Sequence, residues 1–106
     1  MDLKQKNRYT ARAAVIKALA HPSRLLMVEA LSRREHCVCE LTDLVEADIS
    51  TVSKHLALLK NAGIVDDDKR GQMVFYHLKT PCVLNFLSCI ESVLSRRAQE
   101  HAQLVS

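Results

Sequence analysis

The sequence predicts a mostly α-helical fold with a small β-hairpin wing, the architecture of a winged helix-turn-helix domain. Three observations lead to this prediction. Apolar residues recur at helical spacing along most of the chain. Two of the predicted helices are joined by a short turn, and the second has a polar outer face. A β-prone segment, a polar turn and a second β-prone segment follow, which is typical of a hairpin.

Length and composition favour one small domain over residues 1–106. No apolar run approaches the ~20 residues that span a bilayer, and Met1 to Arg12 is too polar for a signal peptide. We therefore expect no membrane partner and a cytoplasmic location. Thiols stay reduced there, so the four cysteines favour metal or redox chemistry over disulfides. The sequence has no C-x-x-C motif, βαβ pattern or glycine-rich cofactor loop, so we expect neither an enzyme nor an organic cofactor.

The first two helices are predicted from apolar stripes. One helix is expected over Thr10–Ala20, and Pro22 fits the first position of the next, where no amide donor is missed. The stripes consist of Val15, Ile16, Leu19 and Ala20 in the first helix and of Leu26, Met27, Ala30 and Leu31 in the second.

A short third helix is expected over roughly Cys39–Glu46, and the fourth is the clearest of all. Asp48 is a good N-cap for it, and Gly63 is a good C-terminal stop. The inner face of this fourth helix is predicted to hold Val52, Leu56 and Leu59, and its outer face Ser50, Lys54, Ala57 and Asn61. The small polar outer face suits close approach to base edges, although a solvated helix face has the same composition.

The segment "IVDDDKRGQMVFYHL" after Gly63 predicts the hairpin, with its turn at Gly71. Lys69 and Arg70 stand near the predicted tip, where they would meet phosphates or the minor groove of duplex DNA. The alternative role of these two cations is to keep the turn soluble. The formal charge of +3 alone is weak support for a nucleic-acid partner.

A last helix is expected from Thr80 as N-cap, with Pro81 at its first position, to about Gln103. Its apolar face is too wide for one small domain to cover, so we expect a homodimer formed through the terminal helices. The alternative is a helix that folds back on the first one. The face consists of Val83, Phe86, Leu87, Ile90, Val93 and Leu94.

Two thiols stand one residue apart in "REHCVCELTD". Thiolates are preferred ligands of soft ions. Residues two apart in a regular helix point ~200° away from each other, so Cys37 and Cys39 can share an ion only where the helix start is irregular. The alternative is burial as small apolar groups. Cys82 and Cys89 lie two turns apart on the last helix, too far for both to hold one ion, and dimer packing is their simpler role.

The stretches "ALAHPSRLLMVEAL", "CVCELTDL", "STVSKHLALLKNAGIV" and "GQMVFYHL" together resemble the ArsR/SmtB family of dimeric winged-helix repressors. The resemblance implies a repressor that leaves its operator DNA when an effector binds. It also implies that the fourth helix reads the major groove. The implied groove-facing residues are Ser50, Thr51, Ser53, Lys54 and His55. Ile49 stands where the family often has glutamine, and Asp66–Asp68 place acid at the base of the wing.

The resemblance also implies that "CVC" is a metal(loid) box, with arsenite or antimonite as the favoured effector and cadmium or lead as alternatives. Relatives often supply a third cysteine at the position of Thr42, so the third ligand is open. The candidates are His36, a small thiol from solution, or Cys82 or Cys89 from across the dimer. A thiol redox switch is the competing mechanism, and it needs a thiol pKa lowered by His36 or by the neighbouring Arg33 and Arg34.

Overall fold

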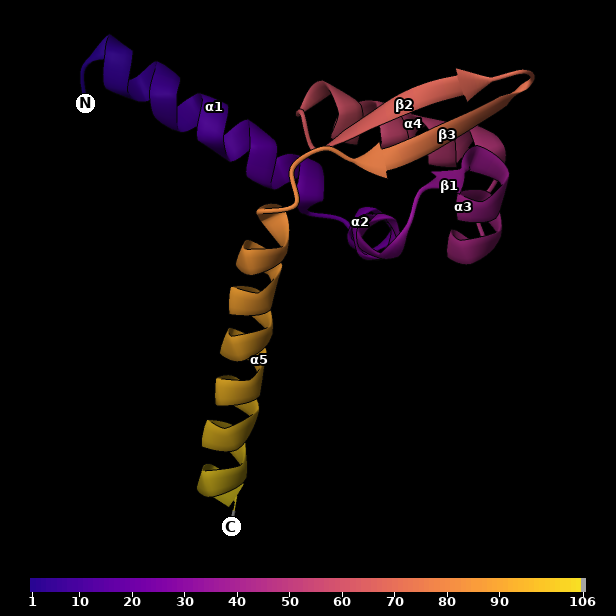
Figure 1. Ribbon diagram of the computed structural model, residues 1–106. Helices are drawn as coiled ribbons and strands as arrows, with labels where there is room; N and C mark the ends of the chain where they lie inside the picture. Colours follow the sequence, from indigo (N-terminus) through magenta and orange to yellow (C-terminus); the bar gives the residue numbers. More distant parts are fainter. Residues whose placement is uncertain (106) are drawn as a thin grey trace.

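The computed structural model describes residues 1–105, which form five helices and three strands (Figure 1). The helices are α1 (Leu3–Leu19), α2 (Pro22–Arg33), α3 (Val38–Val45), α4 (Ile49–Asn61) and α5 (Val83–Val105). The strands are β1 (His36–Cys37), β2 (Val65–Arg70) and β3 (Met73–Leu78). The winged helix-turn-helix predicted from the sequence is confirmed: α3 and α4 form the helix pair, and β2 and β3 form the wing.

The hydrophobic core lies between α2, α3, α4 and the base of the wing. The inner stripe predicted for α4 is fully buried, because Val52, Leu56 and Leu59 have no exposed surface. Around this stripe pack Leu19, Met27, Val28, Leu31, Leu41, Ile64 and Val65. Apolar residues at helical spacing thus place α4 with one face in the core and the opposite face outward.

The wing is part of a three-stranded antiparallel sheet in the order β1-β3-β2. Strand β1 was not expected from the sequence, because it contains two residues and depends on pairing with a segment far along the chain. Its register places Cys37 opposite Phe75. The thiol segment is therefore joined directly to the wing.

Two helix starts differ from the sequence prediction. Helix α1 begins seven residues earlier than Thr10, at Leu3, with Asp2 and Gln5 in a reciprocal capping box. Helix α5 begins at Val83 rather than Pro81, because the preceding segment forms a tight turn in which Thr80 O accepts from Val83 N–H at 3.1 Å.

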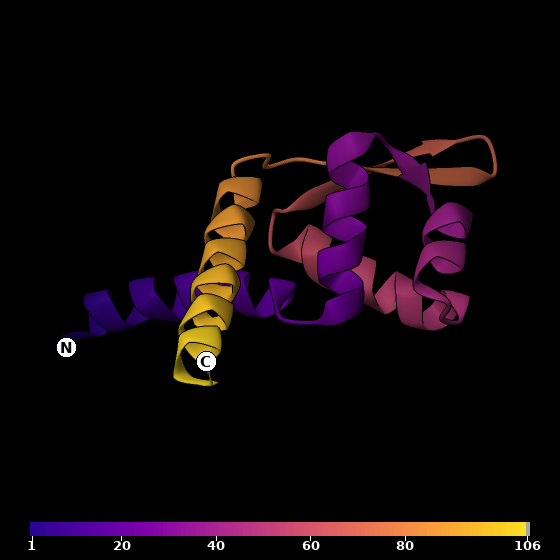
Figure 2. The ribbon, with the colours of Figure 1, turned by 90° about the horizontal axis from the view of Figure 1, so that it is seen from below.

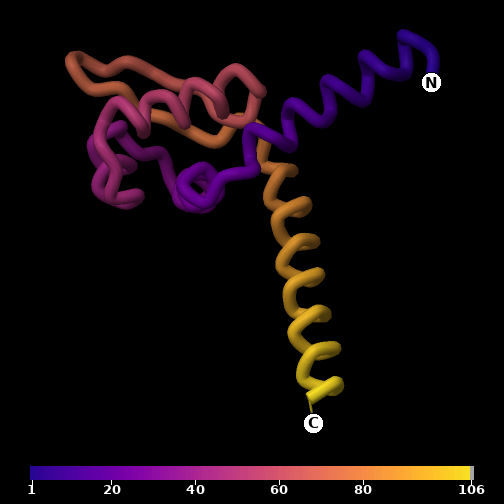
Figure 3. The backbone as a smooth tube through the Cα atoms, turned by 180° about the vertical axis from the view of Figure 1, so that it is seen from behind, coloured from indigo at the N-terminus to yellow at the C-terminus, as the bar shows by residue number. Residues whose placement is uncertain are grey.

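Helices α1 and α5 project away from the core in different directions, as Figures 1, 2 and 3 show from three sides. Helix α5 has no buried residue. Among the described residues, no helix combines the length and apolar character required to cross a membrane. The projecting helices leave the wing and the outer face of α4 uncovered.

Candidate functional site

The outer face of α4 is open to solvent. Ser50, Ser53 and Lys54 are exposed, and Thr51 is half-buried. Asp48 caps the helix: its Oδ1 accepts from Thr51 N–H at 2.7 Å and from the Ser50 hydroxyl at 2.9 Å. These hydrogen bonds hold the pKa of the Asp48 carboxyl below its usual value. The cap fixes the two hydroxyl-bearing residues at the start of the helix.

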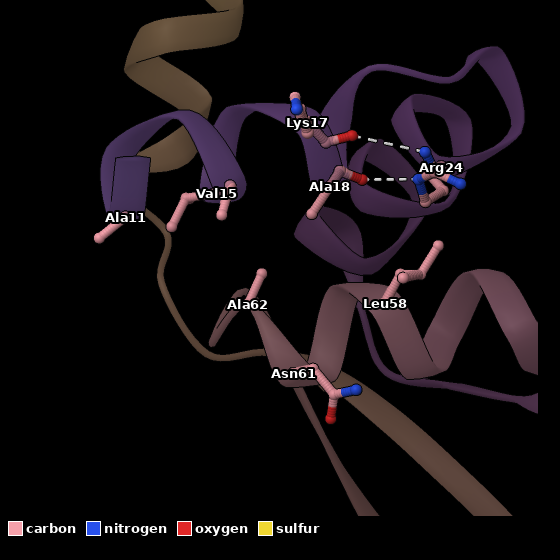
Figure 4. A pocket seen from close by; sticks show the side chains of 9 residues that line it. Ala11, Val15, Lys17, Ala18, Arg24, Leu58, Asn61 and Ala62 are labelled. Atoms are coloured by element: carbon pink, nitrogen blue, oxygen red, sulfur yellow. Dashed lines mark hydrogen bonds between the residues drawn. The ribbon is translucent and has the colours of Figure 1, made fainter. Parts of the chain in front are cut away.

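His55 lies differently from the other four groove-facing candidates, because its ring is held by α2. Its Nδ1 lies 2.9 Å from an Arg24 guanidinium nitrogen, and its ring centroid lies 4.4 Å from that of His21. Arg24 also donates to Ala18 O at 2.6 Å and to Lys17 O at 3.4 Å, as Figure 4 shows. Sequence reasoning did not single out Arg24 or His21. The "HPSR" stretch at the start of α2 was the available signal, but its contacts with α4 depend on tertiary packing.

The wing tip holds Lys69 and Arg70 beside the turn, at the predicted place. The Arg70 guanidinium makes a two-point ion pair with Glu35, at 2.6 and 2.8 Å. It also donates to Asp68 at 3.0 Å and lies 4.7 Å from the centre of the Phe75 ring. The guanidinium is therefore held by two carboxylates and an aromatic face, while Lys69 is exposed.

The thiols of Cys37 and Cys39 converge. Cys37 is the N-cap of α3, with extended backbone (φ −77°, ψ 163°), and Cys39 is the second helical residue. The two sulfur atoms lie 2.7 Å apart. The irregular helix start that shared binding requires is thus already present. Cys37 is buried and Cys39 is exposed.

The surroundings of the pair do not activate Cys37 as a nucleophile. The contact with Cys39 and burial raise the pKa of the Cys37 thiol. Arg34 is bound to Glu40 at 2.7 Å, and His36 Nδ1 lies 3.0 Å from Arg34 O. The Arg34 ion pair and the Cys37 N–H bond lower the pKa of Glu40 to about 2. The lowered thiol pKa that a redox switch requires is therefore not found at Cys37.

Within residues 1–105 of the same chain, no third metal ligand joins the pair. Among residues 1–105, no three His, Cys, Asp or Glu side chains are arranged to hold a metal ion. Thr42, at the position of the third family cysteine, donates its hydroxyl to Val38 O at 2.8 Å. Cys82 precedes α5 and Cys89 lies within it; both are exposed, and α5 lies on the other side of the core from α3 (Figures 1 and 2).

An open groove of about 340 Å³ connects the thiols to α4 and the wing. Cys37, Val38 and Cys39 form one side of it. Ile49 and Ser53 of α4 contribute a second side, and the turn and start of β3 contribute Gln72, Met73 and Val74. The candidate metal ligands and the candidate DNA-reading elements thus border the same space.

Comparison with known proteins agrees with this arrangement. Residues 21–67 match the sequence model of the family described as "Bacterial regulatory protein, arsR family". The crystal structure of Rv0081 from M. tuberculosis aligns with a TM-score of 0.79 and 30% sequence identity, over 89% of this chain and 95% of that one. The chain belongs to the arsR family. This confirms the resemblance inferred from the sequence. The family is one of transcriptional regulators, which also confirms the expectation that the chain is not an enzyme.

Two arsR-family relatives are named after metal or metalloid resistance. A cadmium resistance transcriptional regulatory protein, CadC, of Listeria innocua is 38% identical over 72 residues, which are 67% of this chain and 60% of that protein. The arsenic resistance transcriptional regulator ArsR1 of Pseudomonas putida is 45% identical over 65 residues, which are 60% of this chain and 51% of that protein. The chain thus spans about half to three fifths of the length of these relatives.

Proposed function

We propose that this arsR-family chain is a transcriptional repressor that binds duplex operator DNA and releases it when a thiophilic metal(loid) binds Cys37 and Cys39. The observation that supports this most is the convergence of the two sulfur atoms, 2.7 Å apart, at the start of the helix that precedes α4. The same helix-turn-helix thus contains a soft-ligand pair and an uncovered reading helix.

DNA binding is assigned to the outer face of α4 and to the wing. Ser50, Thr51, Ser53 and Lys54 offer hydroxyl and ammonium donors at the start of α4, where a reading helix contacts base edges. His55, which the sequence predicted to face the groove with them, is assigned a positioning role instead, because Arg24 and His21 contact its ring. Lys69 of the wing is assigned to the phosphate backbone, and Arg70 is assigned to it only once its ion pair with Glu35 opens.

Arsenite or antimonite is the favoured effector, and cadmium or lead is the alternative. Soft thiolates select such centres over hard cations, and the relatives named above carry arsenic or cadmium in their names. Two thiolates that share one ion on bonds of ~2.3 Å at a tetrahedral angle stand about 3.8 Å apart, so the convergence of Cys37 and Cys39 suits a shared ion. An ion held there would act on the N-terminus of α3, which packs against α4.

The test is operator binding titrated with arsenite, using wild type, Cys37→Ser and Cys39→Ser under reducing conditions. We expect each variant to bind DNA but to need at least tenfold more arsenite for release. A tenfold change corresponds to ~1.4 kcal/mol, and the loss of one thiolate ligand should weaken the binding free energy of arsenite by at least that amount. Cys39→Ser is the cleaner variant because Cys39 is exposed, whereas Cys37 belongs to the interior. Release at the wild-type concentration by both variants would contradict the proposal. Cys82→Ser and Cys89→Ser, tested in parallel, show whether either thiol supplies a third ligand across a dimer.

A thiol redox switch remains the competing mechanism, and the same assay separates the two. If peroxide releases the DNA while arsenite has no effect, oxidation is the signal. The raised pKa of Cys37 disfavours Cys37 as the thiol that reacts with peroxide, because the thiolate is the reactive form.

A further inference from the structure

Ile49, the first residue of α4, exposes a large apolar side chain at the start of the proposed reading helix. Its side chain is 61% exposed, while its neighbours Asp48 and Ser50 are polar. Single exposed apolar residues are common on protein surfaces, so the position of Ile49 is more informative than its exposure. A reading helix contacts base edges with its N-terminal residues, and Ile49 stands at that end.

The start of α4 is poorly suited to a phosphate group. The free amides of a helix N-terminus ordinarily favour an anion. Here the carboxylate of Asp48 already takes that place, because its Oδ1 accepts from Thr51 N–H at 2.7 Å. The hydrogen bond from Thr51 lowers the pKa of Asp48, so the carboxylate is charged and repels phosphate. The first cation of α4 is Lys54, more than one turn further along. The first turn therefore favours base edges over the DNA backbone.

Ile49 and Ser53 lie on the same side of α4. They are four residues apart, which places one side chain above the other on a helix. Both border the open groove between α4 and the wing, to which Gln72 and Met73 also contribute. Ser53 is exposed as well. A duplex that contacts both α4 and the wing therefore brings its base edges to Ile49 and Ser53 together.

The side chain of Ile49 restricts what it can recognise. It has no hydrogen-bond donor or acceptor, so it cannot distinguish bases by their polar groups. On the major-groove edges of the four bases, the apolar group is the C5-methyl of thymine. Contact between this methyl and the isoleucine side chain removes apolar surface from water on both partners. Thymine is therefore the base whose edge complements Ile49.

We propose that Ile49 reads the C5-methyl group of one thymine in each half-site of the operator. This inference rests on the proposed function and adds to it a residue that determines sequence specificity. A glutamine at this position would instead favour adenine, whose N6 and N7 it can bond in a bidentate pair. Ile49 thus changes which base is read at the start of α4.

The test removes the methyl group from the DNA. The full chain first selects a preferred site from a random pool of duplexes. Each thymine of that site is then replaced, one position at a time, by deoxyuridine, which lacks only the methyl. We expect one position in each half-site at which the replacement weakens binding about fourfold, and about fifteenfold when both half-sites are changed, from the burial of one methyl group per half-site. At the same position 5-methylcytosine should bind about fourfold more tightly than cytosine.

Three variants assign the effect to a side chain. Ile49→Ala should bind the thymine and deoxyuridine duplexes equally. Leu58→Ala is the matched control, because Leu58 is a 49% exposed apolar residue near the other end of α4, where it borders a pocket beside α1. It should keep the wild-type preference for thymine. Ile49→Gln should lose this preference and gain one for adenine at the same position, a gain that unfolding cannot produce.

The outcomes separate this inference from the proposed function. If wild type binds a selected site but no thymine can be distinguished from deoxyuridine, the inference is overturned, and the proposed DNA binding stands. If Ile49→Ala keeps the wild-type preference for thymine, another residue reads the methyl, and the inference is overturned as well. If the full chain selects no duplex from the pool, the proposed function fails and this inference fails with it.

Discussion

At the residue scale, Arg24 connects three helices through one guanidinium group. Two of its nitrogen atoms bind carbonyl groups at the C-terminal end of α1, and a third lies against His55 of α4 (Figure 4 shows the α1 contacts). A cation at the end of a helix also interacts favourably with the helix dipole. Because arginine remains charged, His55 Nδ1 must act as the acceptor, and the ring is neutral in this arrangement. The side chain that fixes α1 thus also fixes the middle of the proposed reading helix.

His55 should make stability fall in mild acid. Burial, His21 and the Arg24 charge lower its pKa below the ordinary value of 6.5. Below pH 6.5 the unfolded chain therefore binds a proton that the folded protein does not bind, and the free energy of unfolding decreases as pH falls toward the lowered pKa. The slope is at most ~1.4 kcal/mol per pH unit for one proton. We expect His55→Asn, which keeps an acceptor for Arg24, to have a shallower slope between pH 7 and 5 in urea unfolding. His101→Asn, at an exposed position on α5, is the control, and equal slopes for the two variants would contradict this role.

The thiol pair shows at the residue scale how far sequence reasoning extends. Because of their spacing, Cys37 and Cys39 can bind one ion together only where the helix start is irregular. The spacing alone does not reveal where the helix begins. The structure places the boundary between them, because Glu40 accepts from Cys37 N–H at 3.1 Å and keeps Cys37 outside the helix. The contacts of His55 could not be predicted from the sequence either, since Arg24 lies 31 residues away along the chain.

At the element scale, the wing is attached to the thiol segment at two points. Strand β1 pairs with β3, and Glu35, just before β1, binds Arg70 at the wing tip. Asp68 binds the same guanidinium. Within this cluster two carboxylates outnumber the one cation, so Arg70 offers little net attraction to a phosphate while they hold it. A phosphate contact by Arg70 must first break the Glu35 contact.

We therefore expect Glu35→Gln to strengthen DNA binding and to steepen its dependence on salt. Each added phosphate contact changes the slope of log K against log salt by about −0.9. Releasing Arg70 in both protomers of a dimer should thus change it by roughly −2. Operator binding measured over a salt series gives this slope directly.

A double-mutant cycle shows whether Arg70 is responsible. Arg70→Ala should have little effect in wild type but should remove the gain in the Glu35→Gln background. Glu29→Gln removes the same charge from the exposed face of α2 and controls for a general reduction in negative charge. If Glu35→Gln instead weakens binding, Glu35 orients Arg70 toward the DNA and does not mask it.

The elements differ in how well the sequence predicted them, for identifiable physical reasons. The bounds of helix α4 were predicted almost to the residue, because an N-cap, an apolar stripe and a terminal glycine all indicate the same helix. Gly63 indeed has a positive φ of 83°, as expected for a residue that ends a helix. The start of α1 was missed because its first turns are exposed and have no apolar stripe, although Asp2 and Gln5 form a readable capping box. Strand β1 could not be predicted, since its two residues become a strand only through pairing with β3.

At the scale of the whole molecule, one chain does not form a compact body. Its radius of gyration is 16.7 Å. A compact domain of this length would have about 13 Å. The excess comes from α1 and α5, which project from the core (Figure 3). Both helices expose large apolar side chains. These side chains include Val15, Ile16, Phe86, Ile90, Val93 and Leu94. Where α1 and α5 meet, the same surface continues into an open pocket of about 400 Å³ bordered by Val15, Ile16 and Phe86.

Apolar surface of this extent on two projecting helices favours a two-fold dimer, in which each chain covers the surface of the other. We expect Ile90→Glu to raise the dimer dissociation constant at least tenfold, since it would bury an unpaired charge at the centre of the apolar face. The matched control is Ser92→Glu, which places the same charge on the opposite side of α5 by helical period. Analytical ultracentrifugation over a concentration series measures the dissociation constants of both variants.

Operator affinity should fall together with dimerisation, because a symmetric pair of reading helices contacts two half-sites at once. A monomeric wild type, or two variants that dissociate equally, would show that the apolar face of α5 has another role.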